Sequence, residues 1–177
     1  MAHIVFRVKR MKIVLMAGKQ AGCIGLLALL ADKYEVLKVV AYDFMVDELA
    51  KFFGIPTILS VKELDDDSCA KADCLVCVHG REIVKADMRE KFNNKCFNMH
   101  PCLSQYKGAD PISRLLVDRG VFASVGIHVM TDKVDEGEVL EEQFINIEHC
   151  HTVQEVYNEL YPLYAKVLVT ALRHMKV

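Results

Sequence analysis

The chain contains the run Lys95-Cys96-Phe97-Asn98-Met99-His100-Pro101, an apolar segment that carries one amide and one imidazole. Its composition predicts a β-strand that stops at the proline, because proline cannot donate a hydrogen bond to a neighbouring strand. Asn98 and His100 are two residues apart, so their side chains would project from one face near the end of that strand. The run therefore predicts two polar groups held together at the edge of a sheet.

A second polar segment, Val134-Asp135-Glu136-Gly137, follows the strand-like residues 125–130. The glycine would let this loop turn tightly. An Asn, a His and an Asp on neighbouring strand ends would supply an oxyanion donor, a proton-transfer group and a carboxylate that orients it. The same spacing also fits a histidine that merely ends a strand and an aspartate in an ordinary turn. Spacing alone leaves both interpretations open.

Working outward from these segments, strands and helices alternate along the chain. Further strands are expected over residues 12–16, 35–42, 57–59 and 74–78. Helices are expected from near residue 22 to residue 30, over 46–53 and 86–92, and after a capping box at 152–155, whereas the acidic residues 65–67 are typical of a solvated loop. This order predicts an α/β fold with a single open, mostly parallel twisted sheet and helices on both faces. Ligands bind such sheets beyond the carboxyl ends of the strands.

Length, charge and cysteine content exclude several classes of protein. The 177 residues suit one domain, which we assign to residues 11–177, with residues 1–10 as an N-terminal extension or an expression remnant. A net charge of −2 gives no long-range attraction to nucleic acid or to an anionic membrane. Seven cysteines scattered through apolar segments favour reduced thiols and a cytoplasmic protein.

Signals for a membrane, for secretion and for a metal are weak. No apolar stretch reaches the roughly 18 residues that a membrane helix needs, and no secretory signal is recognised. Cys74 and Cys77 have the spacing of half a zinc site, but no second pair follows them. The sequence therefore predicts no membrane span and no metal centre.

Several segments resemble, in their order and near-family spacing, the core of the folate-dependent formyltransferases. They are Asn98-Met99-His100-Pro101, Tyr106-Lys107-Gly108, Gly126-Ile127-His128 and Val134-Asp135-Glu136-Gly137. The family includes glycinamide ribonucleotide formyltransferase, methionyl-tRNA formyltransferase and the sugar N-formyltransferases. The resemblance is densest over residues 96–140. It implies a Rossmann-like catalytic domain that transfers a formyl group directly from N10-formyltetrahydrofolate to an amine, without a metal.

The resemblance also implies roles for three groups of residues. Asn98, His100 and Asp135 match the catalytic positions of the family. The pterin of the donor would lie against residues 77–84, which contribute Arg81, Glu82, Ile83 and Val84, and against the loop around Asp135, which contributes Val134 and Gly137. The acceptor amine would lie near two others, which contribute Gly18, Lys19 and Gln20, and Tyr106, Lys107 and Gly108.

Departures from the family pattern bear on the acceptor. Residues 102–105 replace the frequent S-L-L-P, which leaves the shape of that loop open. Lys19 and Gln20 stand where glycinamide ribonucleotide enzymes carry a small phosphate-binding loop, and no β-domain of the kind that methionyl-tRNA enzymes use follows the last helix. These features favour a small amine, first an amino-sugar nucleotide, and no nucleic acid. A glycinamide ribonucleotide acceptor and a catalytically silent folate- or nucleotide-binding protein remain alternatives, and a homodimer stays open.

Overall fold

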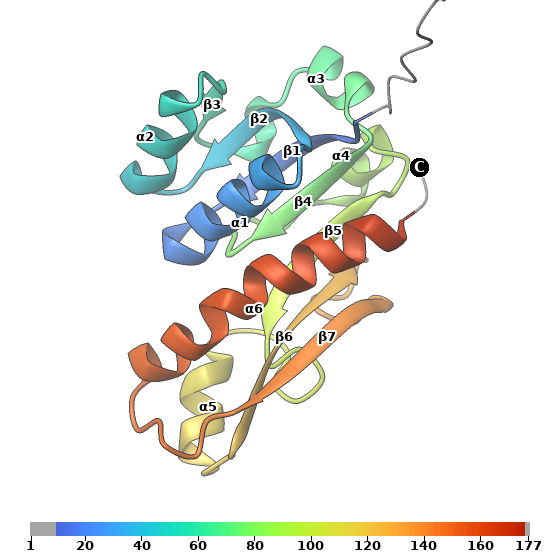
Figure 1. The fold of residues 1–177 in the computed structure, drawn as a ribbon. Coiled ribbons are helices and arrows are strands. Elements are labelled where there is room, and N and C mark those ends of the chain that lie inside the picture. Colours follow the sequence, from blue (N-terminus) through green and yellow to red (C-terminus); the bar gives the residue numbers. More distant parts are fainter. Residues whose placement is uncertain (1–9, 176–177) are drawn as a thin grey trace, which may run out of the picture.

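The computed structural model describes residues 10–175, which form one seven-stranded open sheet with helices on both faces (Figure 1). The strand order across the sheet is β3 (Thr57–Ile58), β2 (Glu35–Ala41), β1 (Lys12–Ala17), β4 (Cys74–Val78), β5 (Cys96–Pro101), β6 (Phe122–Val129) and β7 (Val139–Asn146). The predicted α/β fold with a mostly parallel sheet is confirmed. The extension assigned to residues 1–10 lies outside the described residues, apart from Arg10.

The burial pattern of β1, an interior strand, explains why both faces of the sheet carry helices. Alternate side chains of a strand point to opposite faces, and every residue from Ile13 to Ala17 is buried. Ile13 and Leu15 belong to the apolar cluster that also contains side chains of α1 (Lys19–Ala31), α2 (Phe44–Phe52), α5 (Pro111–Val117) and α6 (Val153–His174). Val14 and Met16 pack on the other face with α3 (Asp66–Lys71), α4 (Ala86–Lys91) and the 3₁₀ turn Val61–Glu63. A strand that is covered on both faces reads as a continuous apolar run.

The direction of the strands changes at β5, and this change positions the site. β4 runs parallel to β5, whereas β6 runs antiparallel to it, with His128 opposite Asn98. The segment after β6 therefore emerges beside the start of β5, where the Met130 N–H donates to the Cys96 carbonyl at 2.7 Å. The expected arrangement on neighbouring strand ends was wrong in this respect, because the loop must return over the sheet face to bring Asp135 to His100.

Three local predictions differ from the structure. The acidic residues 65–67 do not form a loop but begin α3, where Asp65 caps the helix by accepting from the Ser68 N–H and the next two carboxylates face the positive end of the helix dipole. The first helix begins at Lys19, before the expected residue 22. The edge strand β7 was not predicted, since its central residues Glu141 to Gln143 are polar. The capping box of Thr152 and Glu155 is confirmed at the start of α6.

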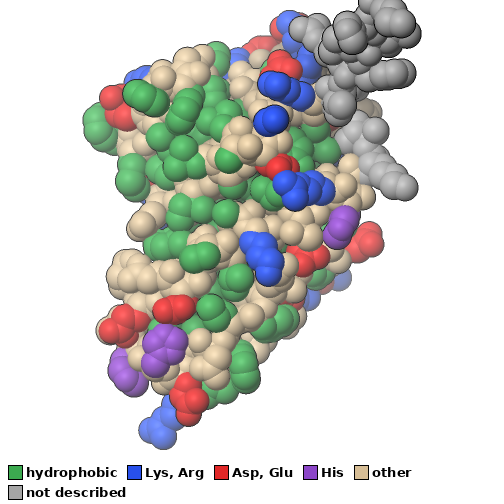
Figure 2. Space-filling view, in the orientation of Figure 1, with side chains coloured by type: hydrophobic (Ala, Val, Ile, Leu, Met, Phe, Trp, Pro, Cys, Tyr) green, Lys and Arg blue, Asp and Glu red, His purple; other side chains and the backbone are tan. Residues whose placement is uncertain are grey.

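Exposed apolar side chains gather over α1 and α2, at the upper left of Figure 2. They are Leu27, Phe44, Met45, Phe52 and Phe53. The homodimer left open by the sequence stays a prediction. Across residues 10–175, no helix is both long and apolar enough to span a membrane.

Candidate active site

A cavity of about 410 Å³ lies over the α4 face of the sheet, between the segment that follows β4 and the segment that follows β6. The rest of its lining comes from side chains of β5 and β6 and from the loop at Gly108. Its lining comprises Cys77, residues 80–84, Asn98, His100, Gly108, Ala109, His128, Met130, Thr131 and residues 133–135. Such a volume is typical of small-molecule sites.

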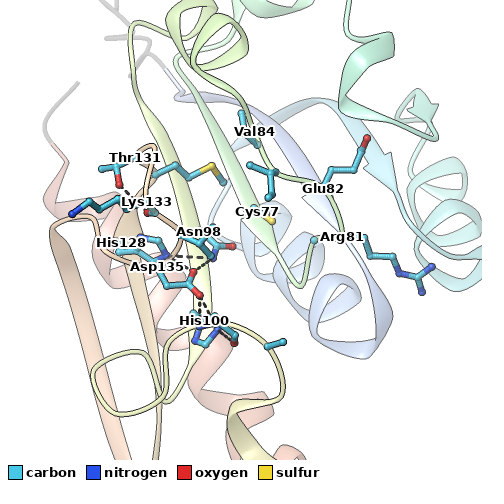
Figure 3. A pocket seen from close by; sticks show the side chains of 16 residues that line it. Cys77, Arg81, Glu82, Val84, Asn98, His100, His128, Thr131, Lys133 and Asp135 are labelled. Atoms are coloured by element: carbon cyan, nitrogen blue, oxygen red, sulfur yellow. Dashed lines mark hydrogen bonds and ion pairs between the residues drawn. The ribbon is translucent and has the colours of Figure 1, made fainter.

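The Asp135 carboxylate is the centre of the polar cluster in this cavity (Figure 3). Its Oδ2 lies 3.2 Å from His100 Nε2 and accepts from the Gly108 N–H at 2.9 Å. Its Oδ1 lies 3.3 Å from His128 Nε2 and accepts from Asn98 Nδ2 at 3.2 Å. Asp135 is only 6 % exposed. The structure thus brings the three predicted catalytic residues together and adds His128 and Gly108 to them.

The surroundings of Asp135 hold it as a carboxylate. Burial raises the pKa of this group, but the hydrogen bond from His128, the nearby charge of His100 and the Gly108 N–H together outweigh burial and lower the pKa from 3.8 to about 2. A full negative charge is therefore present near neutral pH between the rings of His100 and His128.

The hydrogen-bond partners of His100 show which of its ring nitrogens carries a proton. Nε2 lies 3.0 Å from the Gly108 carbonyl oxygen and 3.2 Å from the Asp135 carboxylate. Both neighbours only accept hydrogen bonds, so Nε2 carries a proton. Nδ1 is buried and has no hydrogen-bond partner within residues 10–175. The Nε2 side of the ring therefore faces the polar cluster around Asp135, and the Nδ1 side does not.

His128 supports Asp135 from β6. Its Nδ1 lies 2.9 Å from the Val129 carbonyl oxygen, which can only accept, so Nδ1 carries a proton and the ring is fixed in orientation. The opposite nitrogen, Nε2, faces both Asp135 and the Asn98 amide. Because the β5–β6 register places His128 directly opposite Asn98, the sheet itself sets this contact.

Gly137 has a different role from the one predicted for it. It does not line the cavity. A Cβ at this position would lie 1.7 Å from the Val129 carbonyl oxygen, so the loop passes too close to the end of β6 for any other residue. Gly137 thus determines the path of the loop that carries Asp135, whose own φ of 54° lies in the left-handed region.

The residues predicted to contact the pterin divide into two sets. Ile83 and Val84 line one wall of the cavity and Val134 the other, and Ile83 and Val134 remain 73 % and 56 % exposed. The Arg81 and Glu82 side chains point away from the Asp135 cluster (Figure 3). Two exposed apolar side chains on opposite walls favour a flat apolar ligand between them.

Glu82 anchors the first wall from behind. Its carboxylate accepts from the Tyr42 hydroxyl at 2.9 Å, from Ser60 Oγ at 2.6 Å and from the Val61 N–H at 2.9 Å. These three donors follow β2 and β3, the two strands at the end of the sheet opposite to β7. The carboxylate therefore fixes the position of the segment whose next two residues line the cavity.

The residues predicted for the acceptor lie mostly outside the cavity. Gly18, Lys19 and Gln20 are at the start of α1, where the Lys19 N–H donates to the Asp43 carboxylate. His79 lies near this group: burial lowers its pKa, and the charges of Lys19, Arg81 and His100 lower it further. Lys19 follows β1 and His100 lies near the end of β5, so both are at the carboxyl edge of the parallel strands.

The loop after β5 contributes its glycine to the site and its other side chains to α5. The Tyr106 hydroxyl donates to Asp118 at 2.9 Å, and the Lys107 carbonyl accepts from Arg114 at 2.6 Å. Tyr106 and Lys107 do not line the cavity, whereas Gly108 does, and their contact with an acceptor stays a prediction.

The altered segment at residues 102–105 is held by Glu142 on β7. Its Oε1 accepts from the Ser104 N–H at 3.2 Å, from Ser104 Oγ at 3.1 Å and from Ser124 Oγ at 2.6 Å. The shape of this loop, which the sequence left open, is therefore set by a contact with the edge strand. The loop leads into Gly108, so its shape also determines how Gly108 meets Asp135.

Two lining residues, Ala109 and Met130, lie outside the segments predicted from the sequence to contact a ligand. Ala109 directly follows Gly108 and Met130 ends a predicted strand, which was a usable signal. Within residues 10–175, no group of three or more His, Cys, Asp or Glu side chains is arranged to hold a metal ion.

A family model described as formyl transferase matches residues 59–172. The chain belongs to this family. Proteins with similar sequences include the bifunctional polymyxin resistance protein ArnA of Wigglesworthia glossinidia brevipalpis, which is 28 % identical over 169 residues covering 85 % of this chain and 25 % of that protein. The methionyl-tRNA formyltransferase of Rickettsia prowazekii is 29 % identical over 120 residues, 67 % of this chain and 38 % of that protein. The chain thus spans well under half the length of these two relatives.

Solved structures share the fold of this formyl transferase. Glycinamide ribonucleotide transformylase 1 from Symbiobacterium toebii aligns with a TM-score of 0.80 at 18 % identity, covering 97 % of this chain and 90 % of that one. A formyltetrahydrofolate deformylase from Pseudomonas syringae pv. tomato aligns with a TM-score of 0.77 at 17 % identity, covering 94 % and 61 %. At these identities the likeness establishes the Rossmann-like architecture.

Proposed function

We propose that this protein transfers a formyl group from N10-formyltetrahydrofolate to the primary amine of a small molecule. The observation that carries the proposal is the buried Asp135 carboxylate, which lies between two imidazoles and beside the Asn98 amide in the wall of the cavity. These groups can bind a developing oxyanion and move protons without a serine or cysteine nucleophile. Direct transfer to an amine needs that combination.

Each step of the transfer has a group within the cluster to perform it. The amine nitrogen attacks the formyl carbon, and the resulting oxyanion accepts hydrogen bonds from an Asn98 N–H and from the protonated His100 ring. Asp135 takes the proton that the amine loses, directly or through water. The C–N bond to the folate then breaks as the leaving nitrogen receives a proton from His100, and the proton on Asp135 returns to His100, so both groups regain their starting states.

The walls of the cavity suit the donor. Ile83 and Val134 both line the cavity and both expose apolar surface, which a pteridine ring would cover. Backbone groups of residues 82–84 and of the loop before Asp135 lie beside the cavity and can read the polar edge of that ring.

Titration with a reduced folate should raise the melting temperature, because a ligand that binds only the folded state stabilises it, by about 2.7 kcal/mol at a concentration of 100 times Kd. A Val134→Asp variant should lose this response, since it places a charge against the ring. Val117→Asp is the matched control, because Val117 is exposed on α5 away from the cavity. Wild-type protein that is folded yet responds to no reduced folate would contradict the proposal.

For the acceptor we infer an amino-sugar nucleotide. Lys19 follows β1 and Arg81 follows β4, so both could receive phosphate oxygens at the carboxyl edge of the parallel strands, where β5 carries His100. Glycinamide ribonucleotide, which also carries a phosphate, is the second candidate, and the 97 % coverage by the Symbiobacterium toebii structure fits it equally well.

Incubation with N10-formyltetrahydrofolate and each amine in turn, with the formylated product detected by mass, should give a product with the amino-sugar nucleotide. Lys19→Ala should then raise the KM for the amine several-fold and leave folate affinity unchanged, whereas Lys166→Ala, an exposed site on α6, should change neither. Product from glycinamide ribonucleotide alone would replace the first acceptor with the second. Folate binding without any product would support the catalytically silent alternative.

A further inference from the structure

Arg89 is a buried cation that takes no part in the proposed chemistry. It lies on α4 and is only 6 % exposed, a rare condition for arginine unless its charge is paired. α4 packs behind the cavity and does not contribute to its lining. The hydrogen-bond and ion-pair partners of Arg89 therefore indicate its structural role.

The guanidinium group of Arg89 joins the two walls of the cavity. Nη1 donates to the Val84 carbonyl oxygen at 2.8 Å, and Nη2 forms an ion pair with the Asp132 carboxylate. Val84 belongs to the wall that follows β4, and Asp132 lies between Thr131 and Lys133 of the wall that follows β6. β5 separates these two strands in the sheet, so the walls are not joined by strand pairing.

We propose that Arg89 is a positioning residue that holds the two walls at the separation a flat heteroaromatic ring requires. The inference rests on the proposed folate site, because that ring is the pteridine. A guanidinium is planar and its donors have fixed directions, so two contacts made by one guanidinium set a distance between their acceptors. A site that is already formed before binding avoids the entropic cost of ordering its walls around the ligand.

The Asp132 side of this link can be cut with little risk to folding. The Asp132 side chain is 84 % exposed, so Asp132→Asn removes the charge without opening the core. Arg89→Lys keeps a charge on α4 but replaces the planar fork with a single ammonium. Lys91→Met is the matched control, because Lys91 lies on the same helix and pairs with Asp66 at 2.6 Å, away from the cavity.

Calorimetric titration with tetrahydrofolate gives both Kd and the number of sites per chain. We expect Kd to rise several-fold in Asp132→Asn and about tenfold in Arg89→Lys, with the number of sites unchanged, and no change in Lys91→Met. The double variant should bind no more weakly than Arg89→Lys alone, because both substitutions cut one link. A merely structural role would lower the number of competent sites and leave Kd unchanged, which would overturn the inference.

Hydrogen exchange of the ligand-free protein tests the link independently of folate. Amides in residues 82–85 and 131–134 should exchange faster in Asp132→Asn than in wild-type protein, and in both segments together, because each wall loses its tie to the other. Lys91→Met should leave these amides unchanged. If wild-type protein binds no reduced folate, the proposed function fails, and exchange still decides whether the walls are joined. Unchanged exchange in both segments would overturn the role of Arg89.

Discussion

Replacing Asp135 with Asn should lower kcat by about 10² or more while folate still binds. The substitution keeps the shape of the side chain but removes the charge that lies 3.2 Å from His100 Nε2 and that would accept the proton of the amine. The measurement is the rate of formylated product with the amine that gives turnover, alongside a folate titration of the same sample. Near-normal turnover would remove Asp135 from the mechanism.

The matching change at His100 tests whether the two residues act as a unit. His100→Ala should cost at least as much as Asp135→Asn, because it removes an oxyanion donor and a proton-transfer group together. The double variant should be scarcely slower than the slower single variant, since both act on one intermediate. Losses in the two single variants that add fully would mean that the residues work independently.

Gly137→Ala should have the second largest effect, although this residue touches no ligand. Its Cβ would lie 1.7 Å from the Val129 carbonyl oxygen, so the loop must move by about 1 Å or more, and displacements of that size can cost about 10² in rate. We expect a loss of kcat/KM of that order and weaker folate binding. Both effects follow from displacement of Asp135 and Val134.

Gly54→Ala is the control for replacing a glycine in a turn. Gly54 has a φ of 70° and no atom within 4 Å of an added Cβ, so its replacement strains the local backbone without a clash. It should lower the melting temperature modestly and leave kcat/KM unchanged. If Gly137→Ala behaves in the same way, the close approach at Val129 does not position the catalytic loop.

The elements that could be predicted from the sequence are those whose signal is local. The apolar alternation around Asn98 and His100, ended by Pro101, contains its own evidence for a strand. The same holds for the capping box at Thr152, where both partners lie within one turn. The acidic residues 65–67 gave a local signal that fits both a solvated loop and a helix start, and the interpretation chosen was the wrong one.

The elements that could not be predicted depend on contacts between distant segments. β7 is polar at its centre and becomes a strand only because β6 supplies its hydrogen bonds. The Glu82 side chain points away from the Asp135 cluster because its carboxylate accepts hydrogen bonds from Tyr42 and Ser60. No residue near Glu82 in the sequence indicates either of these donors. The link from Arg89 to Asp132 likewise joins residues that only the folded sheet brings together.

β1 has a consequence for how much of the chain is needed to form a stable domain. The region matched by the family model begins at residue 59, yet β1 lies in the middle of the sheet between β2 and β4. A fragment limited to residues 59–172 would leave β4 with an unpaired edge, a template for aggregation, and would lack the fully buried side chains of Ile13 to Met16. It would also lose Tyr42, one of the donors that hold Glu82. The segment that the family model matches is therefore shorter than the segment that this chain needs to form a stable domain.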